Sequence, residues 1–222
     1  MDRIQRRTRY AAYAMVLGGI ALAVPPWLSG PNGANDTRQR LEGFVADPHP
    51  AMAKSLVFQL AVLLLLPGLI AWVGRAHGRG AVAMFLGAGT AAITTPFAMS
   101  FMLLSGLEVS IAGDGPVNDT LVGAADRMGS SPAAIPTYVG CFLLWHLLAM
   151  PIFSFGLVRS RQVPVWLGLA PAIGMLMAFF GSGSPVERFG WVVLGLALCG
   201  LGVALVRPRV PAVLPAEVPV TV

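Results

Sequence analysis

The chain has 222 residues, of which 56% are hydrophobic and only 11% are charged, and its mean hydropathy is +0.74. Because an ordinary soluble domain carries about a quarter charged residues, this composition excludes a typical water-soluble fold and indicates an integral membrane protein. The net charge of +5 and the pI near 10 come from arginines beside apolar segments, so they indicate attraction to anionic lipid head groups and no nucleic-acid partner.

Six apolar segments are candidates for helices that cross the bilayer. A hydrocarbon core about 30 Å thick requires about 20 apolar residues, and a helix satisfies its own backbone hydrogen bonds. The expected helices cover residues 10–28, 55–74, 81–104, 138–158, 164–180 and 190–206. The sequence therefore predicts an all-α polytopic membrane protein, with residues 1–222 forming a single transmembrane domain of six helices in three hairpins.

Basic residues gather on one side of these segments. The termini and loops on that side hold Arg3, Arg6, Arg7, Arg9, Arg75, Arg79, Arg159, Arg161, Arg207 and Arg209. Because Lys and Arg beside membrane helices are retained in the cytoplasm, both termini are predicted to be cytoplasmic, with residues 207–222 as a cytoplasmic tail. The segments 29–54 and 105–136, which contain most of the carboxylates, are then extracytoplasmic loops.

The first apolar segment has two interpretations. Its Arg-rich start, its apolar run and Ala21-Leu22-Ala23 also fit a cleavable signal peptide. The run is long for a signal peptide and ends at Pro25-Pro26, which favours a membrane helix that is retained. Whether this helix is cleaved stays open.

The residue usage indicates the cellular setting. Arg greatly outnumbers Lys, and Ala, Gly and Val are abundant, which is typical of a GC-rich bacterial genome. The predicted location is therefore a multi-pass position in a bacterial plasma membrane. The tripeptides Asn35-Asp36-Thr37 and Asn118-Asp119-Thr120, which match glycosylation acceptors, are interpreted as caps of short helices.

The same two tripeptides suggest a parallel internal repeat. At an offset of 84 residues the match continues into the following helices, where Phe58, Leu60, Leu63, Leu64, Pro67 and Arg75 correspond to Phe142, Leu144, Leu147, Leu148, Pro151 and Arg159. Both copies would have the same membrane orientation, so the pattern predicts a pseudo-twofold axis along the membrane normal. Coincidence among apolar helices is the alternative interpretation.

One ionisable side chain is expected deep in the membrane. His146 lies near the middle of the fourth segment, where it could face Thr90, Thr94, Thr95 and Ser100 of the third. These residues form the predicted ligand pocket, beside carbonyl groups freed by Pro96. The plainer interpretation is a neutral imidazole that makes one hydrogen bond between helices, and the alternative is a proton carrier or ligand contact.

Candidate catalytic residues are few. Glu108 and Asp114 lie in the most acidic loop, where paired carboxylates could perform acid–base chemistry on a lipid or isoprenoid head group, and His146 is the third candidate. More often, such acids simply keep a loop solvated. No metal and no cofactor is predicted, because Cys141 and Cys199 form no ligand motif and no nucleotide-binding loop is present.

Small residues at a spacing of four predict where helices approach closely. A helix places such residues on one face, and small side chains let two backbones come together within a membrane. The pairs are Gly87 and Ala91, Gly168 and Ala172, and Gly195 and Cys199.

Three classes of function fit these observations. The preferred class is a non-enzymatic membrane protein, either an accessory component or a binder of an apolar or lipidic small molecule, with the bilayer and other membrane subunits as partners. The second is a small transporter or permease subunit, which the repeat and the proline-broken helices favour. The third is an intramembrane enzyme acting on a lipid or isoprenoid substrate, so whether the chain is an enzyme stays open.

Overall fold

The computed structural model describes residues 3–28, 36–113, 115–132, 134–181 and 184–207. Every regular element in this part of the chain is a helix, which confirms the all-α class. In chain order the elements are α1 (Arg3–Ala23), α2 (Pro25–Leu28), α3 (Thr37–Ala46), α4 (His49–Val73), α5 (Ala81–Ala112), α6 (Asp119–Ser130), α7 (Ala134–Tyr138), the π-helix η1 (Val139–Ala149), α8 (Met150–Ser160), α9 (Val165–Phe180) and α10 (Pro185–Val206).

Among the described residues, four helical stretches are long and apolar enough to cross a membrane, which indicates a membrane protein. They are Gln5–Leu28, His49–Val73, Leu143–Ser160 and Pro185–Val206. Two shorter apolar stretches, Ala81–Phe97 in α5 and Val165–Phe180 in α9, accompany them.

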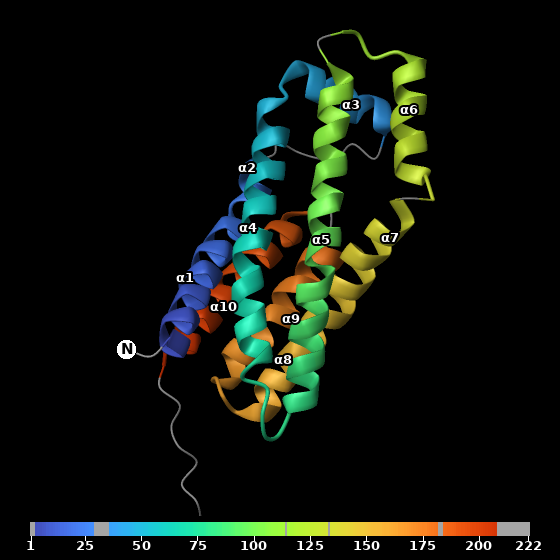
Figure 1. Ribbon diagram of the computed structural model, residues 1–222. Coiled ribbons are helices and arrows are strands. Elements are labelled where there is room, and N and C mark those ends of the chain that lie inside the picture. The colour runs from blue at the N-terminus through green and yellow to red at the C-terminus, as the bar shows by residue number, and fades with distance from the viewer. Residues whose placement is uncertain (1–2, 29–35, 114, 133, 182–183, 208–222) are drawn as a thin grey trace, which may run out of the picture.

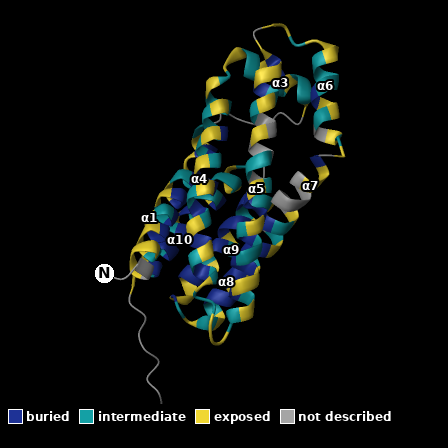
Figure 2. Ribbon diagram, in the orientation of Figure 1, coloured by how far each residue is buried: buried dark blue, intermediate teal, exposed yellow. Residues whose placement is uncertain are grey.

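The long helices form a closed ring. α1, α4, α5, α8, α9 and α10 pack each on the next in this order, α10 returns to α1, and η1 continues the line of α8 against α5. Figure 1 shows this ring below, with α3 and α6 beside the upper part of α5. Buried residues fill the interior of the ring and exposed ones cover its outside (Figure 2), so Trp72, Trp145 and Phe153 lie in the core while Leu60, Ile70 and Phe85 face outward.

Glycines let the ring close. A Cβ atom on Gly19 would lie 2.5 Å from the carbonyl oxygen of Gly195, and one on Gly195 would lie 2.5 Å from that of Gly19, so α1 and α10 touch backbone to backbone. Gly87 of α5 lies in the same way against the backbone of Phe153 in α8. Gly168 contacts Val158, and together these contacts confirm the close approach predicted from the small-residue spacing.

Helices also occupy the two segments expected to be loops. α3 and α6 lie there, α4 starts at His49 and α5 continues to Ala112, beyond the expected limits of 55 and 104. α3, α6 and the end of α5 build a second apolar cluster away from the ring, with Leu41, Ala112 and Ala125 buried. We call α3, α6 and the ends of α4 and α5 beside them the cap.

The predicted helix caps are confirmed in both tripeptides. The Asp36 carboxylate accepts a hydrogen bond from the backbone N–H of Arg38 at the start of α3, over 3.4 Å. The Asn118 side chain accepts one from the backbone N–H of Leu121 at the start of α6, over 2.9 Å. The capping residue is therefore the second of the tripeptide in α3 and the first in α6, so the two tripeptides are not used in the same register.

Arg75 holds the opposite end of the ring together. Its guanidinium donates to the carbonyl oxygens of Ala204 and Leu205 over 3.1 and 2.6 Å, at the end of α10, where carbonyl groups run short of backbone donors and that of Ala204 also accepts from the backbone N–H of Arg207. Its own carbonyl accepts from the Gln162 side chain over 3.0 Å, and its guanidinium lies 5.7 Å from the ring centre of Trp72. Arg75 thus joins α4, α10 and the turn between α8 and α9.

The contact between α5 and α8 can be tested with two glycines of the same helix. Gly87→Ala places a methyl group against the Phe153 backbone, so we expect the free energy of unfolding to fall by about 1–3 kcal/mol. Gly89→Ala meets nothing within 4 Å and should be neutral, or stabilising by up to about 1 kcal/mol through helix propensity. Unfolding of the purified protein in detergent measures both, and equal effects would contradict the close packing.

Candidate functional site

The hydroxyl groups of the predicted ligand pocket bond to their own helix. Thr94 Oγ1 donates to the carbonyl of Thr90 over 2.8 Å, and Thr95 Oγ1 donates to that of Ala91 over 2.9 Å. Ser100 Oγ donates in the same way to the carbonyl of Pro96 over 2.9 Å. Bonds from Ser and Thr to the preceding turn are local and bend a helix, so the donor protons of these hydroxyls are already used within α5.

His146 belongs to η1, which packs against α5. The fold therefore brings the segment that carries His146 beside the helix that carries Thr90, Thr94 and Thr95. The His146 side chain lies outside the described residues, so its predicted contact with these threonines stays a prediction. The π-helical form of η1 is uncommon, and such segments are frequent at functional sites.

Glu108 is held by an arginine of the cap. Arg40 Nε and Nη2 donate to its two carboxylate oxygens, each over 3.1 Å, and only 15% of the Glu108 side chain is exposed. A bidentate pair of this kind fixes the orientation of the carboxylate. Because both oxygens accept from Arg40, the pair fastens α3 to α5 and leaves Glu108 poorly placed to exchange a proton with a substrate.

The other acidic residues of the cap also bond to α3. Asp119 forms an ion pair with Arg38, and Arg38 Nη1 donates to the Val117 carbonyl over 3.2 Å. The Thr37 hydroxyl donates to Asp126 Oδ1 over 2.7 Å. Asp114 lies outside the described residues. In the described part of the chain, no three His, Cys, Asp or Glu side chains gather as metal ligands would.

The structure adds a feature that sequence reasoning did not identify. A groove of about 1070 Å³ lies between the first turns of α1 and the last turns of α4 and α10. We call it the basic groove, and its lining residues are Gln5, Arg7, Thr8, Arg9 and Ala11 of α1, Leu66, Pro67, Ile70 and Ala71 of α4 with Gly74 and Arg75 after it, and Leu205, Val206 and Arg207 at the end of α10. In the sequence these arginines indicate only the orientation in the membrane, because their spacing along the chain gives no sign that they converge in space.

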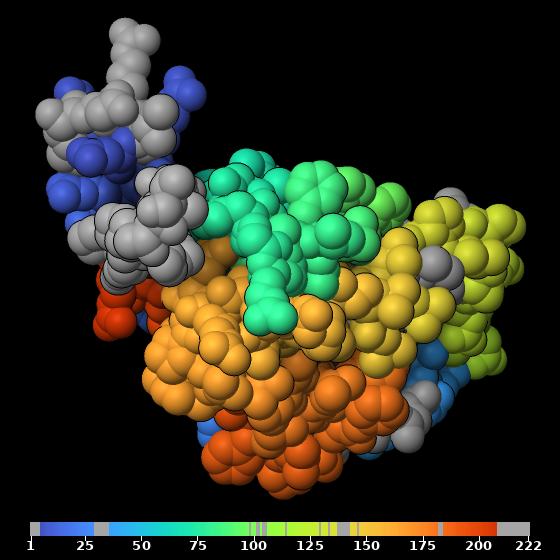
Figure 3. Space-filling model, turned by 90° about the horizontal axis from the view of Figure 1, so that it is seen from below, coloured from blue at the N-terminus to red at the C-terminus, as the bar shows by residue number. Residues whose placement is uncertain are grey.

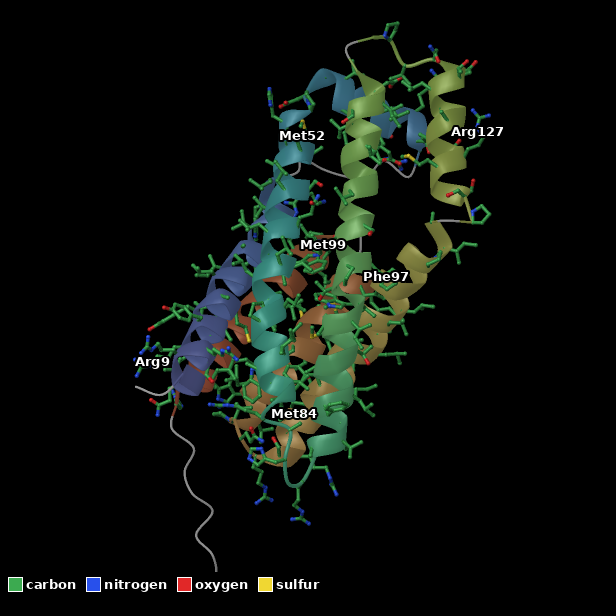
Figure 4. The ribbon with its side chains drawn as sticks, viewed as in Figure 1. Arg9, Met52, Met84, Phe97, Met99 and Arg127 are labelled. Carbon is green, nitrogen blue, oxygen red and sulfur yellow. The ribbon has the colours of Figure 1, made fainter. Side chains whose placement is uncertain are left out.

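The basic groove combines an apolar side with a positively charged rim. Leu66, Pro67 and Ile70 form the apolar side, and Arg7, Arg9 and Arg207 are exposed at the rim. Seen from this end, α1 and the last turns of α10 lie together at one edge of the molecule (Figure 3). Arg9 projects outward from the first turns of α1, at the opposite end of the molecule from Arg127 of the cap (Figure 4).

The two ends of the molecule carry opposite types of charge. The end with the basic groove, here the basic end, also carries Arg79 in the turn after α4, Arg159 in the last turn of α8 and Arg161 directly after α8. The described Asp and Glu residues lie at the other end, here the acidic end, and they are Asp36, Glu42, Asp47, Glu108, Asp119, Asp126 and Glu187. Within the described residues, the guanidinium groups at the rim therefore have no carboxylate beside them.

No protein-family model matches the chain, and comparison with curated proteins and with solved structures finds no similar one. The functional interpretation therefore depends on the residues themselves.

The role of Glu108 can be tested by a double-mutant cycle with Arg40. If the carboxylate fastens α3 to α5, Glu108→Gln and Arg40→Gln should each lower stability, with a coupling free energy of about 1 kcal/mol. In both variants the rate of backbone amide hydrogen exchange should rise in α3 and stay unchanged in the ring. Glu42→Gln, at an exposed position of the same helix α3, is the matched control and should change neither quantity. A coupling of zero would mean that Glu108 is free of Arg40 and available for chemistry.

Proposed function

We propose that the chain crosses the plasma membrane of a bacterium six times, with both termini and the basic end in the cytoplasm. In addition to the four long apolar helices, the 16 residues of α9 rise about 24 Å, which approaches the thickness of a hydrocarbon core. α5 has 32 residues and extends about 48 Å, enough to cross the core and to continue into the cap.

Aromatic residues support this placement in the bilayer. Tyr10, Tyr13 and Trp166 are exposed toward the basic end, and Trp27 and Phe189 are exposed toward the acidic end. Tyr and Trp favour the two membrane–water interfaces. From Tyr10 to Trp27 the helical rise amounts to about 25 Å, so the two belts stand roughly one hydrocarbon core apart.

We infer that the protein has no catalytic role and acts as an accessory component that binds an apolar or lipidic molecule. This proposal depends on one contrast: some polar residues are bonded within the protein, whereas others are exposed at the basic groove. Glu108, Thr94 and Thr95, which were candidates for chemistry or ligand contact, are used in bonds within the protein. The basic groove, in contrast, offers an apolar side and exposed charged groups, which is the combination that orients a ligand in a binding site.

A second candidate function is a small transporter or permease subunit. Two helix boundaries also differ by 84 residues, since α3 and α6 end at Ala46 and Ser130, and α5 and α9 begin at Ala81 and Val165. Duplicated helix units of this kind are common in transporters. No nucleotide-binding loop is present in the sequence, so an ATP-driven version would need a separate ATPase chain.

The order of helices in the ring favours a rotation different from the predicted half turn. A half turn would exchange α4 with α8 and α5 with α9. Because α5 packs on α8, the same rotation would require α9 to pack on α4. Among the described helices, α5 packs on α8, α9 on α10 and α1 on α4. This order suits three antiparallel helix pairs, α4–α5, α8–α9 and α10–α1, related by about a third of a turn around the membrane normal.

The topology can be tested by labelling two introduced cysteines. In a chain with Cys141 and Cys199 replaced, His77→Cys lies in the turn after α4 and Gly115→Cys lies beyond α5, and both positions are exposed. A membrane-impermeant maleimide added to intact cells should label position 115, and it should label position 77 only after the membrane is permeabilised. Labelling of both positions from one side would contradict the proposed orientation.

The absence of a catalytic role can be tested in cells. We expect an apolar or lipidic species to copurify with the protein in a fixed molar ratio, as measured by mass spectrometry of an organic extract. Its total amount in cells should not depend on the protein, because a binder does not convert what it binds. The Glu108→Gln variant should retain the species. A product that appears only with the wild-type protein and disappears with Glu108→Gln would establish the enzyme alternative instead.

A further inference from the structure

We propose that the basic groove binds an anionic phospholipid from the adjoining leaflet, with the phosphate at the arginine rim and the first carbons of the acyl chains along the apolar side. This inference rests on the proposed function, since it needs the basic end to lie at a membrane surface. It adds the chemical class of the lipidic molecule and the place where it binds.

The position of the apolar side argues for an amphiphile. Leu66, Pro67 and Ile70 belong to the last turns of α4, one of the helices long enough to span the membrane. Ile70 is 57% exposed, so this side of the groove opens to the surroundings of the ring, where lipid chains would lie. A ligand confined to water would contact the arginines but would leave these apolar side chains uncovered.

The rim argues for an anionic head group. Arg7, Arg9 and Arg207 come from two helices and converge on one groove, and no described carboxylate lies at this end to neutralise them. Basic pockets between membrane helices on the cytoplasmic side commonly hold the phosphates of anionic lipids. The charge of the groove is therefore complementary to the leaflet that the proposed topology places beside it.

Arg75 has a different task from the three arginines of the rim. Its guanidinium is used by the carbonyl oxygens of Ala204 and Leu205 and by the face of Trp72. These contacts fix the end of α10 against α4, which makes the base of the groove rigid. Arg75 therefore positions the walls, and a test that removed it would confuse lost binding with lost structure.

The size of the groove distinguishes a lipid from a small anion. Ligand sites for drug-sized molecules occupy about 300–1,000 Å³. A groove of about 1070 Å³ lies just above that range and is far larger than an inorganic phosphate requires. The same arginines would attract free phosphate, so the test must separate the two sources.

The test is native mass spectrometry of the detergent-purified full chain with added lipid. Phosphatidylglycerol and phosphatidylcholine with identical acyl chains are compared for the wild type and for the triple variant R7Q/R9Q/R207Q. The wild type should prefer phosphatidylglycerol, and the triple variant should lose on the order of 100-fold in affinity for it, since each arginine near an anionic surface contributes about a factor of five.

The matched control is R79Q/R159Q/R161Q, which removes the same charge from exposed positions of the same end outside the groove. It should bind phosphatidylglycerol as the wild type does. Equal losses in the two triple variants would overturn the inference in favour of general surface charge, and displacement of the lipid by inorganic phosphate at equal concentration would overturn it in favour of a soluble anion.

The outcomes also separate this inference from the proposed function. Equal binding of phosphatidylglycerol and phosphatidylcholine, unaffected by R7Q/R9Q/R207Q, would reject the groove as an anionic site while a lipid-binding function stands. Binding of neither lipid by the wild type, together with an organic extract that contains no copurified species, would reject both.

Discussion

The structure depends on the approach of helix backbones at glycines. Lipid tails are as apolar as leucine, so membrane helices gain little from apolar contact alone and associate through close packing and hydrogen bonds. The interface of α1 with α10 uses Gly19 and Gly195, and that of α9 with α10 uses Gly174 and Gly190. Gly87 and Gly156 join α5 to α8 in the same way. These contacts join three of the neighbouring helix pairs that close the ring.

The two ends of the molecule use their charges differently. In the cap, Arg38 and Arg40 meet Asp119 and Glu108, so that opposite charges neutralise each other and tie α3 to its neighbours. At the basic end, Arg75 binds backbone carbonyls, and the exposed arginines of the groove have no described carboxylate near them. The charges of the cap thus serve its structure, whereas those of the rim remain available to a ligand.

The sequence predicts features that depend on neighbouring residues, such as helix caps and small-residue faces. It does not predict side-chain pairs between residues far apart in the chain. The contact at Gly87 follows from the spacing of small residues on one helix face, and the caps at Asp36 and Asn118 follow from residue type alone. The pair of Arg40 with Glu108 spans 68 residues, and no pattern in the sequence indicates it. A threonine within a membrane helix can bond to its own turn or to a neighbour, so the sequence alone could not tell which partner Thr94 and Thr95 would take.

The place of the basic groove follows from the way the hairpins are connected. α4 is joined to α5, and α8 to α9, by short turns at the basic end, where Gly80 and Arg161 adopt left-handed backbone angles, with φ of 82° and 55°. Arg75 and Gln162 link these two turns by a hydrogen bond. The third pair in the ring, α10 and α1, packs side by side, with the first turns of α1 beside the last turns of α10. Arg75 also bonds to the end of α10, so the basic groove lies against the point where α4 and α10 are held together, with α1 as its third side.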